Sequence, residues 1–166
     1  APCDFASGAR YIDKTEADVK AAFQCGARVG TSSMDEPERP MEAMVAAVGD
    51  GGEVAQCNAG FLRDDAILVV TFITDEDDSS SKSAGTPDGW KTALMAAKNL
   101  DETAIVVLGV FGGLGSCDAE PSSRLEEFVG LFGERGFHGD VCASNYESFF
   151  LDAVNTIQTT CDEFVP

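Results

Sequence analysis

The residues of this chain best suited to chemistry are acidic ones that follow a long apolar run. The run Ala66–Ile73 leads directly into the polar segment Thr74–Ser80. Side chains at the carboxyl end of a buried parallel strand lie where α/β proteins bind ligands. Oxygen ligands of this kind suit Mg²⁺, Ca²⁺ or Mn²⁺. The candidate metal ligands of this segment are Asp75, Glu76, Asp77 and Asp78. The alternative interpretation is a solvated acidic loop.

A second candidate is a pair of hydroxyl residues that precedes a predicted helix. The segment Val29–Ser33 reads Val-Gly-Thr-Ser-Ser, and Thr31 is the residue that we single out in it. A hydroxyl at this place is either a metal ligand or the N-cap of the following helix, since threonine and serine favour N-cap positions.

The six cysteines indicate disulfides and an oxidising compartment. The sequence contains no Cys-x-x-Cys pair, and His138 is its only histidine, so a zinc site is not expected. An even number of cysteines without metal spacing is typical of secreted, periplasmic or cell-surface proteins, and buried free thiols are the alternative. Many pairings are open to six cysteines. We favour, in this order, Cys117–Cys142, Cys3–Cys25 and Cys57–Cys161.

The charge of the chain excludes some partners. Eleven Lys and Arg against 29 Asp and Glu give a formal net charge of −18. Such a chain repels nucleic-acid phosphates and anionic lipid surfaces. No apolar run is long enough to cross a bilayer, so we expect neither nucleic acid nor a membrane span.

The elements that must position these residues are strands alternating with helices. Ala66–Ile73 and Ala104–Phe111 are near-continuous apolar runs, as expected for strands buried on both faces of a parallel sheet. Shorter strands are predicted at Phe137–Cys142, Ala9–Ile12 and Ala27–Val29.

Helices are predicted where apolar residues recur at helical spacing. These segments are Val19–Phe23, Met41–Val48, Trp90–Ala97, Leu125–Phe132 and Tyr146–Phe164. Their expected N-caps are Thr15 for the first, Ser122 or Ser123 for the fourth, and Ser144 or Asn145 for the last. The alternation predicts a single α/β domain over residues 1–166, with a mostly parallel sheet and helices on both faces.

Three segments together resemble von Willebrand factor A-type (VWA) domains. "ILVVTFITDEDDSS" is similar to the fourth strand and metal loop of that family. "VGTSSMDEPERPMEAM" is similar to its threonine loop and the following helix. The lead-in Gly60–Ala66, which reads Gly-Phe-Leu-Arg-Asp-Asp-Ala, looks like that of A-type domains in secreted bacterial proteins and lipoproteins.

This resemblance implies a doubly wound, VWA/Rossmann-like fold and a metal-ion-dependent adhesion site that holds Mg²⁺ or Ca²⁺. By motif, Thr31 is its threonine ligand and Asp75 its aspartate, with Glu76, Asp77 and Asp78 as second choices. The family's Asp-x-Ser-x-Ser loop, which follows its first strand, is not found anywhere ahead of Ala66–Ile73. The chain is therefore expected to hold about the C-terminal two thirds of the fold and to be incomplete at its N-terminus.

The missing first strand of the family normally lies beside the fourth. Without it, Ala66–Ile73 is expected to expose an edge of unpaired backbone groups, which is an aggregation hazard. The expected partner is therefore another protein or the missing N-terminal segment of the same fold, unless the fold is rearranged.

Three functions follow from these patterns. The first is a non-enzymatic, extracellular or periplasmic module for protein binding, adhesion or assembly through a divalent cation. The second is a structural VWA-like module without metal, as part of a larger assembly. The third is a Mg²⁺-dependent phosphatase of the haloacid-dehalogenase type, in which Asp75 is the nucleophile and Asp77 the acid/base.

Overall fold

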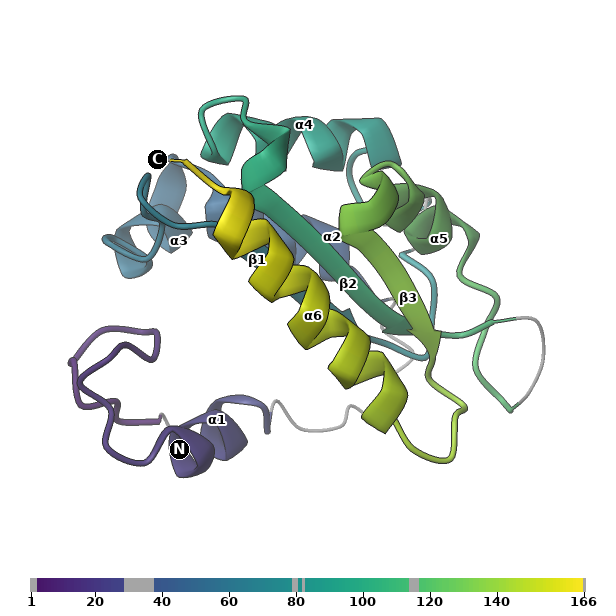
Figure 1. The fold of residues 1–166 in the computed structure, drawn as a ribbon, viewed down its shortest axis with the longest axis horizontal. Helices are drawn as coiled ribbons and strands as arrows, with labels where there is room; N and C mark the ends of the chain where they lie inside the picture. Colours follow the sequence, from purple (N-terminus) through teal and green to yellow (C-terminus); the bar gives the residue numbers. More distant parts are fainter. Residues whose placement is uncertain (1–2, 29–37, 79–80, 82, 114–116, 166) are drawn as a thin grey trace.

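The computed structural model describes residues 3–28, 38–78, 81, 83–113 and 117–165. Over these residues the chain is a mixed α/β structure, as predicted (Figure 1). Its strands are β1 (Leu68–Ile73), β2 (Ile105–Phe111) and β3 (Gly136–Asp140). Its α-helices are α1 (Val19–Gly26), α2 (Pro40–Val48), α3 (Gly52–Cys57), α4 (Pro87–Ala97), α5 (Ser123–Gly130) and α6 (Glu147–Glu163). Two short 3₁₀ helices are η1 (Glu102–Ala104) and η2 (Gly133–Arg135).

The sheet of the described residues has three strands in the order β1-β2-β3, and both pairs are parallel. Leu68 of β1 lies opposite Ile105 of β2, and Val107 of β2 lies opposite Gly136 of β3. The two apolar runs are therefore neighbouring parallel strands, as their composition predicted. The doubly wound VWA arrangement stays a prediction.

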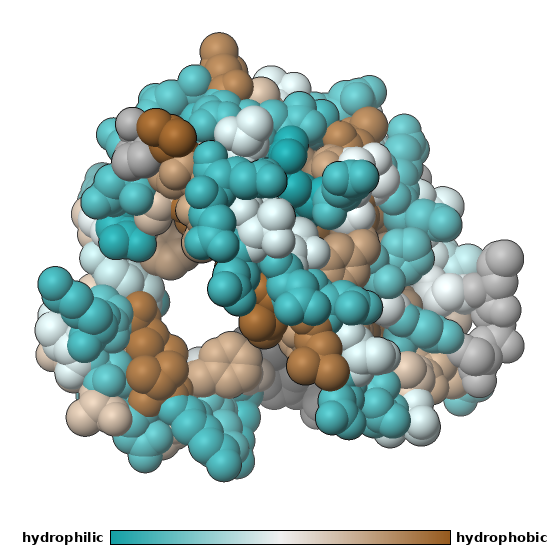
Figure 2. All heavy atoms as spheres, in the orientation of Figure 1, coloured by the Kyte–Doolittle hydropathy of each residue, from teal (hydrophilic) through white to brown (hydrophobic). Residues whose placement is uncertain are grey.

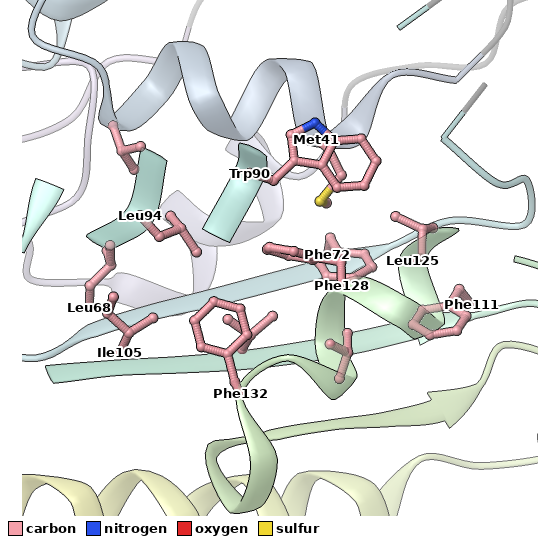
Figure 3. Close-up of a cluster of buried hydrophobic side chains, with 13 residues drawn as sticks. Met41, Leu68, Phe72, Trp90, Leu94, Ile105, Phe111, Leu125, Phe128 and Phe132 are labelled. Atoms are coloured by element: carbon pink, nitrogen blue, oxygen red, sulfur yellow. The ribbon is translucent and has the colours of Figure 1, made fainter. Parts of the chain in front are cut away.

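One face of the sheet carries the larger core. Side chains of α2, α4 and α5 pack there against β1 and β2, and Figure 3 shows the aromatic centre of this layer. Trp90 and Phe132 each lie edge-on to Phe128, with centroid distances of 5.7 and 5.5 Å. Both crossover helices, α4 and α5, cover this same face, as expected when successive parallel strands are added in one direction.

The opposite face is covered by α6 alone among the described helices. Phe149 and Ala153 of α6 pack against the even-numbered residues of β2, which are Val106, Leu108 and Val110. The odd-numbered residues of β2 face the other core, so β2 is buried on both sides over its whole length. In Figure 1, α6 crosses the sheet diagonally, and its C-terminal end lies near the start of β1.

The segment of residues 3–28 lies apart from the sheet (Figure 1). It contacts the body where the Tyr11 ring packs at a tilt against Phe61, with the centroids 5.6 Å apart, and the Tyr11 hydroxyl donates a hydrogen bond to the Ala59 carbonyl. Residues 9–12 form bends and loop, so the strand predicted there was wrong, and the strand predicted at Ala27–Val29 is a turn and loop at Ala27 and Arg28, with Val29 outside the described residues.

The N-cap of the first helix differs from the expected one. Asp18, not Thr15, is the N-cap of α1 and accepts from the Ala21 N–H at 2.9 Å. Thr15 lies three residues before this N-cap, and its hydroxyl donates to the Asp13 carboxylate.

Two of the three favoured disulfides are formed. Cys117–Cys142 joins the loop after β2 to the residues after β3, and Cys3–Cys25 closes the N-terminal segment. The third pair is not formed, since Cys57 and Cys161 are both free and exposed. No helix of the described ranges has the length and apolar character needed to cross a membrane.

One hydrogen bond shows which backbone groups of β1 point toward β2. The Thr74 N–H donates to the Val110 carbonyl of β2 at 3.0 Å. Backbone groups of alternate residues in a strand point to opposite neighbours. The N–H and C=O groups of Val70 and Phe72 therefore pair with β2, whereas those of Val69, Thr71 and Ile73 point to the outer edge.

This geometry predicts an alternating pattern of amide protection along β1. In site-resolved hydrogen exchange, we expect Val70, Phe72 and Thr74 to exchange slowly, because their N–H groups lie in the ladder. Thr71 and Ile73 should exchange at least about tenfold faster, because no strand of the described residues pairs with them. Equal protection of both sets would mean that a further strand already covers this edge.

Candidate functional site

The acidic segment after β1 lies at the carboxyl end of the sheet and divides into two pairs. Thr74 is buried, and its hydroxyl donates to the Glu76 carbonyl and accepts from the Glu76 N–H, which makes a tight turn. This turn leaves Asp75 and Glu76 exposed. Asp77 is half-buried and Asp78 is buried. The four neighbouring carboxylates therefore have different environments.

Asp77 caps α5 from a distant part of the chain. Its Oδ2 accepts from the Arg124 N–H at 3.1 Å, and its Oδ1 accepts from the Leu125 N–H at 3.3 Å. Oδ1 also accepts from the Asp78 N–H at 2.9 Å. Ser122 is the N-cap residue by position, as expected, but its side chain makes no capping bond. The carboxylate instead meets the unpaired N–H groups and the positive end of the helix dipole.

Asp78 is an acidic side chain that is fully removed from water. Its side chain is 0% exposed, and its Oδ1 lies 3.1 Å from Nη1 of Arg124. Its Oδ2 accepts from the Met41 N–H in the first turn of α2 at 3.0 Å. A charge buried in this way requires a paired charge and hydrogen bonds to both oxygens, and Asp78 has them.

Arg124 completes a brace that joins three helices to the end of β1. Besides the Asp78 carboxylate, its guanidinium donates to the carbonyls of Asp78 at 2.6 Å and Gly85 at 2.7 Å. The guanidinium also lies over the Trp90 ring of α4, 4.7 Å from its centroid. We call Asp77, Asp78 and Arg124 the acidic brace.

Glycine is the only residue type that fits at position 85, where the carbonyl accepts from Arg124. Its φ is +92°, in the left-handed region, and a Cβ there would lie 2.7 Å from Nε1 of Trp90. The Trp90 indole N–H donates to the neighbouring Ala84 carbonyl at 3.2 Å. The loop before α4 is thereby wrapped closely around the tryptophan.

The loops after β1 and β2 lie side by side at this end of the sheet. The Glu120 N–H donates to the Asp75 carbonyl at 2.8 Å, and the Ser122 N–H donates to the Gly112 carbonyl at 3.2 Å. The backbone at Asp75 is therefore held in place. In the part of the chain that is described, no hydrogen bond or ion pair involves the Asp75 carboxylate.

The five residues predicted as metal ligands are thus placed differently. Asp75 and Glu76 are exposed, Asp77 and Asp78 bind protein donors, and Thr31 lies outside the described residues. Within the described ranges, no group of three or more His, Cys, Asp or Glu side chains is arranged to hold a metal ion. A cation at Asp75 would therefore take its other ligands from elsewhere.

Sequence reasoning missed the role of Arg124. The residue follows Ser122 and Ser123 in an ordinary helix start, and its partners are about forty residues away along the chain. The one available signal was the presence of a lone basic residue in the first turn of a helix, where a positive charge is unfavourable unless it is paired.

Comparison of the chain with protein families, with curated proteins and with solved structures finds no match. The likeness to VWA domains therefore rests on the residues quoted above.

The buried and the exposed acidic residues predict losses of stability of different size for the same substitution. Asp78→Ala should lower the free energy of unfolding by about 3 kcal/mol, because it leaves Arg124 without its buried counter-charge. Asp77→Ala should cost about 1 kcal/mol through loss of the cap. Asp75→Ala should change it by less than about 0.5 kcal/mol.

Urea denaturation with the disulfides intact measures all three variants. Equal losses for Asp75→Ala and Asp78→Ala would show that burial and pairing do not distinguish these side chains.

Proposed function

We propose that the chain is a non-enzymatic binding module of the VWA type that acts outside the cytoplasm. In this proposal Asp75 contributes a carboxylate to Mg²⁺ or Ca²⁺, and a group from a protein partner or another segment completes the coordination. The observation that carries the proposal is the position of Asp75. Its side chain is exposed on a fixed backbone at the carboxyl end of a parallel strand, and the described protein groups leave it without a partner.

The neighbouring residues support this choice of ligand. Asp77 and Asp78 already satisfy their oxygens with N–H groups and a guanidinium. A divalent cation would have to displace these bonds to reach them. Asp75, with Glu76 beside it, requires no such displacement. The two disulfides are compatible with the oxidising environment of a secreted or cell-surface protein.

The phosphatase alternative receives less support from the same contacts. Its acid/base would be Asp77, and a general acid must hold a proton and then release it to the leaving group. Both oxygens of Asp77 accept hydrogen bonds at the start of α5, so this role would require the cap to open.

A structural module without metal is the second candidate. The observation that favours it is the same acidic brace, since half of the acidic segment contributes to folding. The acidic residues then serve stability and solubility, and Asp75 has no ligand.

Calorimetric titration with Ca²⁺, Mg²⁺ and Mn²⁺ separates the two candidates. We expect one of these ions to bind, and Asp75→Asn to weaken its binding at least about tenfold, which corresponds to about 1.4 kcal/mol. The matched control is Asp65→Asn, the same change at an exposed aspartate before the other end of β1, and it should leave binding unchanged. No uptake at millimolar cation, or equal uptake by Asp75→Asn, would contradict the metal proposal and favour the structural module.

A further inference from the structure

The outer edge of β1 is the surface that remains unexplained. β1 is as apolar in sequence as β2, but β2 is buried throughout, whereas β1 is only partly covered. Thr71 and Ile73 are exposed, and the Ile73 side chain has 61% of its surface open to solvent. A strand with this composition is expected to have neighbours on both sides.

The other edge of the sheet is protected in the usual manner, and β1 is not. β3 is a short strand of five residues that reads Gly-Phe-His-Gly-Asp. Short, polar, glycine-containing edge strands resist pairing with other chains. β1 has six residues, with no charge, proline or glycine among them. Of the two edges, β1 is therefore the one able to accept another strand.

A hollow lies along the first half of this edge. A cavity of about 160 Å³ is lined by residues 61–63, residues 66–69 and Lys98. A second cavity, of about 550 Å³, lies between Tyr11–Lys14 and residues 60, 61 and 63, and it shares Phe61 and Arg63 with the first. Figure 2 shows an opening between the N-terminal segment and the body, with apolar side chains on both of its sides.

Side chains on the α6 side of β1 extend this apolar surface. Val69 packs in the α6 cluster, and Ile73 projects to the same side because side chains alternate along a strand. A strand added to β1 would therefore meet apolar groups as well as backbone hydrogen-bonding groups.

The charges at the two ends of the edge identify the chemistry of the occupant. Among the exposed residues, Arg63, Asp64 and Asp65 precede β1, and Asp75 and Glu76 follow it, so each end carries more acidic than basic side chains. A second copy of the chain would bring the same acidic residues against these, in addition to its own net charge of −18. The ends of the edge instead complement a segment with basic residues at its own ends.

We propose that the β1 edge is a strand-addition site for another polypeptide segment, which is extended, apolar and flanked by Lys or Arg. The segment pairs with the N–H and C=O groups of Val69, Thr71 and Ile73 and becomes a fourth strand of the sheet. The backbone pairing does not depend on the cation proposed at Asp75, because it requires no metal, although Asp75 also contributes to the acidic end of the edge.

The test uses a fluorescent peptide of alternating valine and threonine, with one residue facing each residue of β1 and a lysine at each end. Binding is measured in EDTA, so that failure of the cation proposal cannot affect the result. We expect saturable binding below about 1 mM. In a second peptide, N-methyl groups replace the amide hydrogens along the edge that faces β1, so this peptide cannot form the ladder. It should bind at least about tenfold more weakly.

Two variants locate the binding to the edge. Thr71→Pro removes an outward N–H and leaves the ladder to β2 intact, so it should weaken binding at least about tenfold without unfolding. Ile73→Lys changes an exposed side chain and places a positive charge where it repels the basic peptide, so it should also weaken binding. It replaces the proline variant if that variant does not fold. Leu100→Lys is the matched control, because Leu100 is 71% exposed and lies in the loop after α4. Its affinity should stay within about twofold of the original.

Hydrogen exchange of the complex gives the decisive readout. Thr71 and Ile73 amides should become protected on binding, while Val70 and Phe72 change little. Absence of peptide binding, or equal binding by Thr71→Pro, would overturn the proposal. Sedimentation that shows a dimer of the free chain, lost in Thr71→Pro, would assign the edge to a second copy and would also overturn it.

Discussion

The ion pair between Asp78 and Arg124 is the interaction on which the arrangement of this end of the molecule depends. It links the end of β1 to the start of α5, and through Met41 and Trp90 it also fixes α2 and α4. Burial of a carboxylate is unfavourable unless it is paired with an opposite charge and hydrogen-bonded. Because these donors come from separate helices, the helices must keep their relative positions for Asp78 to remain buried. The packing of these helices on one face of the sheet therefore depends on this ion pair.

This constraint explains why adjacent acidic residues have different roles. The turn at Thr74 directs Asp75 and Glu76 outward, and the next two residues direct their carboxylates into the protein. The inner pair is used in folding, and the outer pair is available for a ligand. The open edge of β1 ends at the same turn. A rigid loop at the end of an incompletely covered strand would hold a bound segment and an exposed carboxylate in fixed positions relative to each other.

Much of this fold was predictable because it is local in the sequence. Apolar runs identified β1 and β2, and helical spacing identified α2, α4, α5 and α6 within a few residues of their bounds. Errors occurred where competition between neighbours decides the outcome. Asp18 caps α1 in place of Thr15, whose hydroxyl binds Asp13, and the short helix α3 was not expected in a segment that begins with Gly51 and Gly52.

The acidic segment was located from sequence, but its division was not predictable. Asp77 and Asp78 find their partners about 46 residues along the chain, and no periodicity or motif indicates such contacts. The sequence pattern made all four carboxylates candidate ligands, whereas in the structure Asp77 and Asp78 bind protein groups. The same limit applies to Cys57 and Cys161, which were paired by elimination and are free thiols in the structure.

The central claim is that Asp78 and Arg124 stabilise the fold as a pair. A double-mutant cycle with Asp78→Asn, Arg124→Gln and the double variant tests it most directly, with free energies of unfolding from urea denaturation. We expect the sum of the two single losses in unfolding free energy to exceed the loss of the double variant by at least about 1.5 kcal/mol, since residues in one network do not act independently. Additivity within about 0.5 kcal/mol would contradict the account, because it would show that the two side chains contribute separately.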